Sequence, residues 1–178
     1  MSDALTCVIY GTDTGNTEEV ARRITARLDD LGLGVDIRDV DSIDVNTLTQ
    51  YEFLILGIPT WDYGGIQQDW EDLEDGLSQL DLSNKVVAMY GLGDQNGYSE
   101  WFVDAMGWLY ERLQNSNANF VGRWPTEGYD FDASRAANED KSLFCGLALD
   151  EDGQSDKTDE RIEKWIDQIL GEYIALIS

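Results

Sequence analysis

The stretch Gly11-Thr12-Asp13-Thr14-Gly15-Asn16-Thr17 separates an apolar run at residues 5–10 from a segment with helical periodicity. It places three threonine hydroxyls and an asparagine at a turn from a strand into a helix, without a lysine or an arginine. The first turn of a helix offers free backbone N–H groups at the positive end of the helix dipole, which suits a phosphate. Because only hydroxyls and amides are present, we expect a tightly bound ligand here rather than a nucleotide that is hydrolysed.

The composition is strongly acidic. The 178 residues include 12 Lys and Arg against 36 Asp and Glu, a formal charge of −24, and no histidine. Such a surface repels nucleic-acid backbones and anionic lipids, so we expect no role on nucleic acid or membrane. The charge serves either solubility alone or partners with a basic docking face. Histidine catalysis is excluded, and two cysteines cannot supply a thiolate zinc or iron–sulfur site from one chain.

The length fits one domain over residues 1–178, without repeats or a linker. No apolar run reaches the length of a membrane span, and the N-terminus has no signal-peptide pattern. Cys7 and Cys145 both lie in strand-like runs. We expect them to be buried free thiols, which is in keeping with a cytoplasmic location.

Apolar runs alternate with helical patterns along the chain. The periodicity predicts helices at 16–31, around 70–77, at 99–113 and from 162 onward, and strands at 5–10, 35–40, 53–57, 85–91, 120–124 and 143–149. These strand–helix units predict an α/β fold, a doubly wound five-stranded parallel sheet of order 2-1-3-4-5 with helices on both faces. The polar segment 125–142 is interpreted as a loop inserted into strand five.

Ligands of such sheets bind beyond the carboxyl ends of the strands, where the winding direction reverses. In the predicted order this point lies between strands one and three, so the loops after strands one, three and four meet there. The second and third of these loops contain Trp61 and Tyr98. Either aromatic alone could pack on the edge of the domain, but both beside a phosphate turn indicate a flat aromatic ligand.

Over essentially its whole length the chain resembles a flavodoxin of the long-chain type. The resemblance rests on the turn at residues 12–17, on Pro59-Thr60-Trp61-Asp62-Tyr63-Gly64, on Gly93-Asp94-Gln95-Asn96-Gly97-Tyr98, and on the stretch 147–156 before the last helix. It implies a non-covalent FMN, with the phosphate on the turn, Asp13 directed away from it, and the ring between Trp61 and Tyr98. The residues implied to bind FMN are Thr12, Asp13, Thr14, Gly15, Asn16, Thr17, Pro59, Thr60, Trp61, Asp62, Tyr63, Gly64, Leu92, Gly93, Asp94, Gln95 and Tyr98. Thr14 and Asn16 could equally cap the helix.

The resemblance also implies a function. The family's members carry single electrons at low potential, cycling FMN between semiquinone and hydroquinone, and are not enzymes. The peptide between Asp62 and Tyr63 is implied to turn on reduction, although Asp62 stands where the family often has asparagine or glycine. The implied partners are transient and basic-faced, a reductase as donor and a low-potential oxidoreductase as acceptor, and the chain is expected to be a monomer. The acidic pairs at 71–72 and 74–75 are either docking charges or a solvated helix face.

Three other functions can be compared with these residues. A receiver-type signalling domain needs an aspartate at the end of strand three and a lysine after strand five, and this sequence offers neither. A P-loop hydrolase needs a lysine in the turn. A flavin-dependent quinone reductase remains the alternative, and it requires an open flavin face that Trp61 and Tyr98 are expected to cover.

Overall fold

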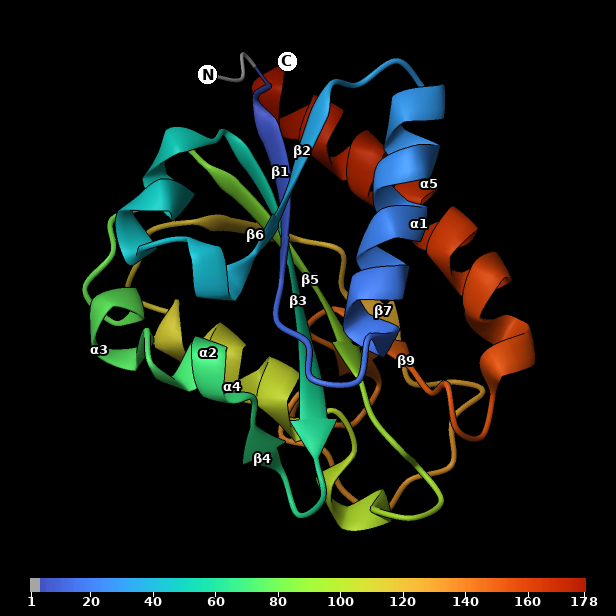
Figure 1. The fold of residues 1–178 in the computed structure, drawn as a ribbon. Helices are drawn as coiled ribbons and strands as arrows, with labels where there is room; N and C mark the ends of the chain where they lie inside the picture. The colour runs from blue at the N-terminus through green and yellow to red at the C-terminus, as the bar shows by residue number, and fades with distance from the viewer. Residues whose placement is uncertain (1–3) are drawn as a thin grey trace.

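The computed structural model describes residues 4–178 and is built around a parallel sheet (Figure 1). The strands lie in the order β2-β1-β3-β5-β6, and β9 also pairs with β5. The predicted order 2-1-3-4-5 is therefore confirmed, with β5 as the fourth strand and β6 and β9 sharing the fifth position. The parallel strands are β1 (Thr6–Tyr10), β2 (Val35–Asp39), β3 (Phe53–Trp61), β5 (Val86–Leu92), β6 (Asn119–Val121) and β9 (Leu147–Leu149).

Helices cover both faces of the sheet, as predicted. One face carries α1 (Asn16–Asp30) and α5 (Thr158–Ile177), and the other carries α2 (Gln68–Glu71), α3 (Glu74–Leu77) and α4 (Asp104–Arg112) (Figure 1). Successive strand residues point to opposite faces. Along β1, Cys7 and Ile9 join the core beneath α4, whereas Val8 and Tyr10 join the core beneath α1. The central strands are buried on both sides, which explains their continuous apolar runs.

The fifth strand is split by an inserted segment, as predicted. In β6, Asn119 pairs with Val86 at the start of β5, and in β9 Leu147 pairs with Tyr90 near its end. The inserted segment carries an antiparallel pair, β7 (Trp124–Pro125) with β8 (Leu143–Phe144). Trp124 therefore belongs to the insertion, and its expected place in strand five was wrong. Cys145 likewise lies between β8 and β9 rather than in a strand.

The second loop of the predicted site is partly strand. β3 continues beyond residue 57, because Ile58 and Pro59 pair with β5 and because β4 (Gly65–Ile66) turns back and pairs antiparallel with Thr60 and Trp61. The strand prediction at 53–57 was therefore too short, and only residues 62–64 form the turn. This hairpin holds Thr60 and Trp61 by backbone pairing, Thr60 with Ile66 and Trp61 with Gly65.

The helix predicted at 99–113 is interrupted. A 3₁₀ turn, η3 (Ser99–Trp101), precedes a break at Val103, whose φ is 49°, and α4 follows. The Phe102 amide donates to the Ala133 carbonyl over 3.3 Å, and the Ala105 amide donates to Thr60 Oγ1 over 3.0 Å. Tertiary partners therefore use amides that a continuous helix would pair internally.

The remaining connections are short. The single helix predicted around 70–77 is divided into α2 and α3, and 3₁₀ turns occur at η1 (Val40–Ser42), η2 (Val45–Gln50) and η4 (Ser155–Lys157).

The helix predicted to end at Gly32 does so with φ 90° at that glycine, and the Leu33 amide donates to the Leu28 carbonyl. Cys7 and Cys145 are free thiols, but only Cys7 is buried as predicted, and Cys145 is half-buried. Within residues 4–178, none of the helices has the length and apolar character needed to cross a bilayer.

Candidate functional site

The turns that follow β1, β3, β5 and β9 meet at the carboxyl edge of the sheet. The chain leaves β1 toward β2 on one side and returns through β3 on the other, so the winding reverses beside β1. This is the position at which open parallel sheets bind ligands.

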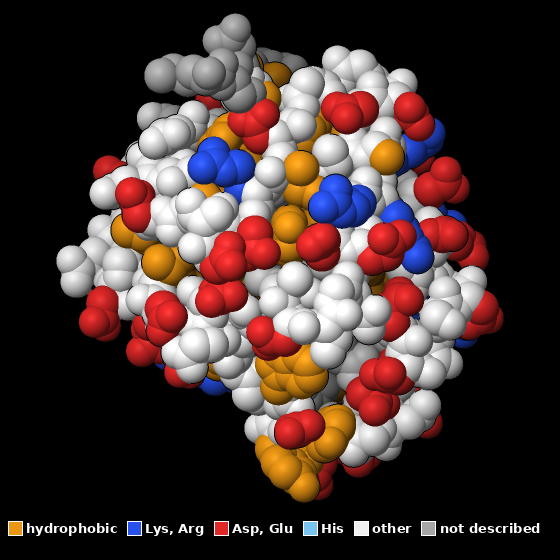
Figure 2. Space-filling model, viewed as in Figure 1, with side chains coloured by type: hydrophobic (Ala, Val, Ile, Leu, Met, Phe, Trp, Pro, Cys, Tyr) orange, Lys and Arg blue, Asp and Glu red, His pale blue; other side chains and the backbone are white. Residues whose placement is uncertain are grey.

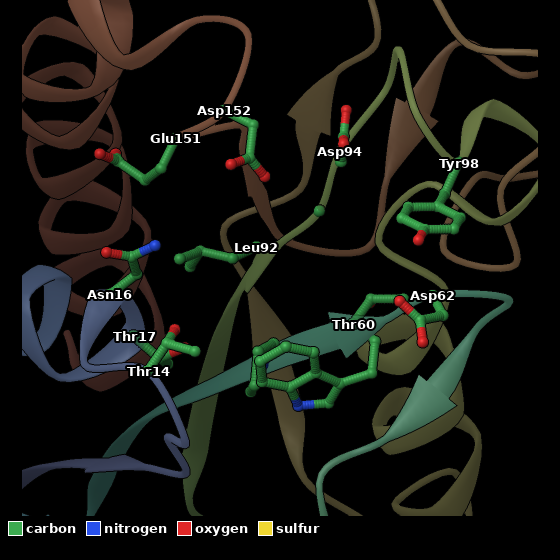
Figure 3. Close-up of a pocket in the computed structure, with 13 residues that line it drawn as sticks. Thr14, Asn16, Thr17, Thr60, Asp62, Leu92, Asp94, Tyr98, Glu151 and Asp152 are labelled. Carbon is green, nitrogen blue, oxygen red and sulfur yellow. The ribbon is translucent and has the colours of Figure 1, made fainter.

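A cavity of about 310 Å³ lies at this edge. In Figure 3, Thr14, Asn16 and Thr17 approach it from the N-terminus of α1, and Asp62 and Tyr98 approach it from the opposite side. Its size falls at the lower end of the range for small-molecule sites. It is lined by Thr14, Asn16, Thr17, Pro59, Thr60, Trp61, Asp62, Leu92, Gly93, Asp94, Tyr98, Glu151 and Asp152.

The turn at the start of α1 leaves the first helical amides without a side-chain partner among the described residues. Gly15 has φ 95°, and its amide donates to Thr12 Oγ1 over 2.9 Å. Its carbonyl accepts the first helical hydrogen bond, from Glu19. Among the described residues no side chain caps this helix, so the alternative role of Thr14 and Asn16 as helix caps is not seen. The amides of the first helical turn are thereby available to an anion.

The Trp61 side chain offers an aromatic wall and a free donor. Its indole Nε1 is buried, and no atom of the described chain accepts a hydrogen bond from it. A buried donor without a partner is costly in a folded protein. Trp61 at the wall of the cavity therefore has an indole N–H group without an acceptor in the described chain.

On the opposite side of the cavity, Tyr98 packs against its neighbours. Its ring meets Tyr63 edge-on, with the ring centroids 5.6 Å apart at 87°, and Tyr63 meets Trp101 in the same way at 5.0 Å. A hydrogen bond to the Asp62 carboxylate raises the pKa of the Tyr98 hydroxyl, which Figure 3 draws directed toward Asp62. Asp62 itself has φ 43°, a left-handed conformation that aspartate adopts more readily than bulky residues.

The cavity is acidic. Asp62, Asp94, Glu151 and Asp152 line it, and no lining residue among those described is Lys or Arg. Burial, reinforced by the neighbouring carboxylates Asp94, Asp150 and Glu151, raises the pKa of Asp152. Figure 2 shows Asp and Glu spread over the molecular face, with few Lys or Arg among them. Hydrophobic side chains gather in that view at the end where the β3–β4 turn lies, and Tyr63 of this turn is 72% exposed.

Not every expected site residue lines the cavity. Thr12 and Gly15 shape the turn, Asp13 is exposed, and Gly64 occupies the β3–β4 turn with φ 84°. Tyr63 faces solvent, and Gln95 is buried.

The site prediction also omitted Glu151 and Asp152, which line the cavity directly after β9. The rule that loops after parallel strands form the site includes them, once the second half of the split strand is recognised.

The residues and their arrangement match those of known proteins. The flavodoxin family model matches residues 8–165. The chain belongs to the flavodoxin family. It is 48% identical over 166 residues to flavodoxin 2 of Escherichia coli K12, covering 93% of this chain and 94% of that one. It is 45% identical over 170 residues to the flavodoxin of Haemophilus influenzae, covering 95% of each.

A solved structure agrees with this family assignment. The flavodoxin of Fusobacterium nucleatum, in a crystal structure with bound flavin mononucleotide, matches with a TM-score of 0.86 at 29% identity. The match covers 94% of this chain and 97% of that chain. The resemblance inferred from the sequence motifs is confirmed for the family and for the flavodoxin fold.

Proposed function

We propose that this chain is an electron carrier that binds FMN non-covalently at the carboxyl edge of its sheet and passes single electrons between redox proteins. The observation that carries the proposal is the cavity itself, which joins an uncapped helix N-terminus to a wall with an unpartnered indole donor. The family membership and the flavin-bound relative support the same ligand.

The residues present fit FMN. The free amides at the start of α1, together with the hydroxyls of Thr14 and Thr17, suit the phosphate without any cationic side chain. Trp61 and Tyr98 supply aromatic surface for the ring. Asp62, Gly93 and Asp94 line the same cavity, and their backbone groups could serve as hydrogen-bond partners for polar edges of the ring. When bound, FMN supplies the one-electron chemistry that no side chain of this chain provides.

The protein's own contribution is to bind the cofactor, to orient it and to set the electrostatic potential around it. Carboxylates at the cavity disfavour additional negative charge there, and buried aromatic surface solvates such charge poorly. We therefore expect a strongly reducing carrier. If the added negative charge is destabilised by the equivalent of one pKa unit, about 1.4 kcal/mol, the one-electron potential falls by roughly 60 mV.

The acidic surface suits transient docking to redox proteins with basic faces. Complementary charges at the edge of a docking interface mainly raise the rate of association, and dissolved salt screens their attraction. Electron transfer to a basic partner should therefore slow as salt is raised, and a rate that is indifferent to salt contradicts this part of the proposal. We further propose a monomer in the cytoplasm, where its two free thiols stay reduced.

The experiment that tests the function is a stepwise reduction of the full chain with FMN, followed by visible spectroscopy. We expect one FMN per chain and two separate one-electron steps. A chain that fails to bind FMN contradicts the proposal. Turnover of NAD(P)H and a quinone by this protein alone would instead establish the alternative, a flavin-dependent reductase.

A further inference from the structure

Gln95 belongs to the loop that follows β5, is 3% exposed and does not line the cavity. Its Nε2 donates to Asp150 Oδ2 over 2.8 Å, and its backbone N donates to the same oxygen over 3.2 Å. Its Oε1 accepts from the Asp130 amide over 2.7 Å. Both ends of the side-chain amide therefore have partners of matching polarity, which an ionised carboxylate or an apolar side chain could not satisfy.

Asp150 connects two segments of the site. Its side chain is fully buried, and its Oδ1 accepts from the amides of Asp152 and Gly153 over 3.1 and 2.8 Å. Among the described residues it has no ion pair with Lys or Arg, so N–H donors alone compensate its charge. The carboxylate thus ties the loop of Asp94 and Tyr98 to the turn that carries Asp152.

Asp130 belongs to the inserted segment, and its neighbour Tyr129 is firmly held. The Tyr129 hydroxyl donates to the carbonyl of Ala148 in β9 and accepts from Trp124 Nε1 over 2.9 Å. The Arg161 guanidinium of α5 lies 4.1 Å from the centre of the Tyr129 ring. The inserted segment is therefore anchored to β9 and α5 at the point where it reaches Gln95.

We infer that Gln95 is a positioning residue through which the inserted segment and Asp150 hold the 93–98 loop ready for FMN. This inference rests on the proposed function. Besides these contacts, the Gly93 amide at the start of the loop donates to the Leu149 carbonyl of β9 over 3.0 Å, and the Tyr98 amide donates to the Asp94 carbonyl within the loop, also over 3.0 Å. If the loop is already ordered in the free protein, less of the binding free energy is lost to ordering it when the ligand binds.

The test compares two variants of the full chain. Gln95→Met removes both side-chain hydrogen bonds, and Gln95→Glu opposes the Asp150 carboxylate. Gln114→Glu is the matched control, because Gln114 is exposed and its Nε2 donates only to the nearby Tyr110 carbonyl. At about pH 8 we expect both Gln95 variants to bind FMN about tenfold more weakly than wild type, and the control to match wild type.

The pH dependence of FMN affinity separates a positioning role of Gln95 from a general loss of structure in the variants. In Gln95→Glu the introduced carboxyl faces Asp150, with Asp94 and Asp152 close by, and Arg161 over Tyr129 is the cation of this region. Protonation restores a donor toward Asp150, so affinity relative to wild type should recover near pH 5 in Gln95→Glu but not in Gln95→Met.

Hydrogen exchange in the wild-type chain tests the connection without any variant. FMN should slow exchange over residues 128–132 more than over residues 138–142 of the same inserted segment. Equal protection of the two stretches overturns the inference, and so do Gln95 variants that bind FMN like wild type. A wild-type chain that does not bind FMN overturns the proposed function and this inference together.

Discussion

The Gly15 amide donates a hydrogen bond to the Thr12 hydroxyl over 2.9 Å, across the turn that leads from β1 into α1. This bond closes the turn from within and leaves the following amides of the helix start to a ligand. Thr12 does not line the cavity, so its effect on a phosphate is to shape the turn around it.

Replacement of Thr12 should weaken the binding of the phosphate end alone. Thr12→Val removes the acceptor, and Thr12→Ser keeps it. We expect Thr12→Val to bind FMN about fivefold to tenfold more weakly, as the loss of about 1 kcal/mol predicts. Fluorescence titration with FMN and with riboflavin, which has no phosphate, checks this. An equal loss for both ligands would contradict the assignment of the turn.

Gly15 and Gly32 offer a matched pair of substitutions at the two ends of α1. They have φ 95° and 90°, and a Cβ at either position meets no atom within 4 Å. Either change to alanine should cost about 1–2 kcal/mol of unfolding free energy, through the left-handed backbone alone. Only Gly15→Ala should also weaken FMN binding. Urea unfolding without ligand and FMN titration separate the two effects.

Local sequence patterns predicted the helices and strands whose residues follow a simple pattern of burial. The apolar runs of β1, β3 and β5 and the periodic apolar face of α1 reflect burial on one or both sides, so their positions could be inferred without knowledge of the fold. The site followed from topology, because parallel strands end at one edge, where Trp61 lies at the end of β3 and Tyr98 lies in the loop after β5.

The features that the sequence did not predict depend on distant partners. The break before α4 at Val103 occurs within an unbroken helical spacing of apolar residues, and it is stabilised by the Ala133 carbonyl and the Thr60 hydroxyl. Likewise, the extension of β3 to Trp61 needs β4 to pair with it. Neither partner lies within the local window from which a helix or a loop is predicted.

Neutralising one cavity carboxylate should raise the second one-electron potential of the bound cofactor. Asp152 and Asp156 are both exposed, but only Asp152 lines the cavity. We expect Asp152→Asn to raise that potential by about 20 mV, which corresponds to about 0.5 kcal/mol of screened interaction. Asp156→Asn should change it less. Spectroelectrochemical titration of both variants checks the difference, and equal shifts would mean that net charge, not cavity position, sets the potential.

The buried thiol of Cys7 should make the protein less stable in alkali. Its side chain is fully buried in β1, and burial raises its pKa from 9.0 to about 12. The unfolded chain therefore loses this proton at lower pH than the folded chain, so the stabilisation present below pH 9.0 is lost as pH rises toward about 12. Each such group should lower the unfolding free energy by up to about 1.4 kcal/mol per pH unit within that window.

Urea unfolding in steps above pH 9.0 measures this slope, and Cys7→Ala should make it shallower by about one proton. The tyrosines Tyr51 and Tyr129, with pKa values raised by burial to about 12, contribute to the same loss and remain in both proteins. The difference between wild type and Cys7→Ala therefore reports the thiol together with its effect on the pKa of the neighbouring Tyr51. If the two slopes coincide, Cys7 ionises in the folded chain as readily as in the unfolded one, and its side chain is less protected from water than its full burial indicates.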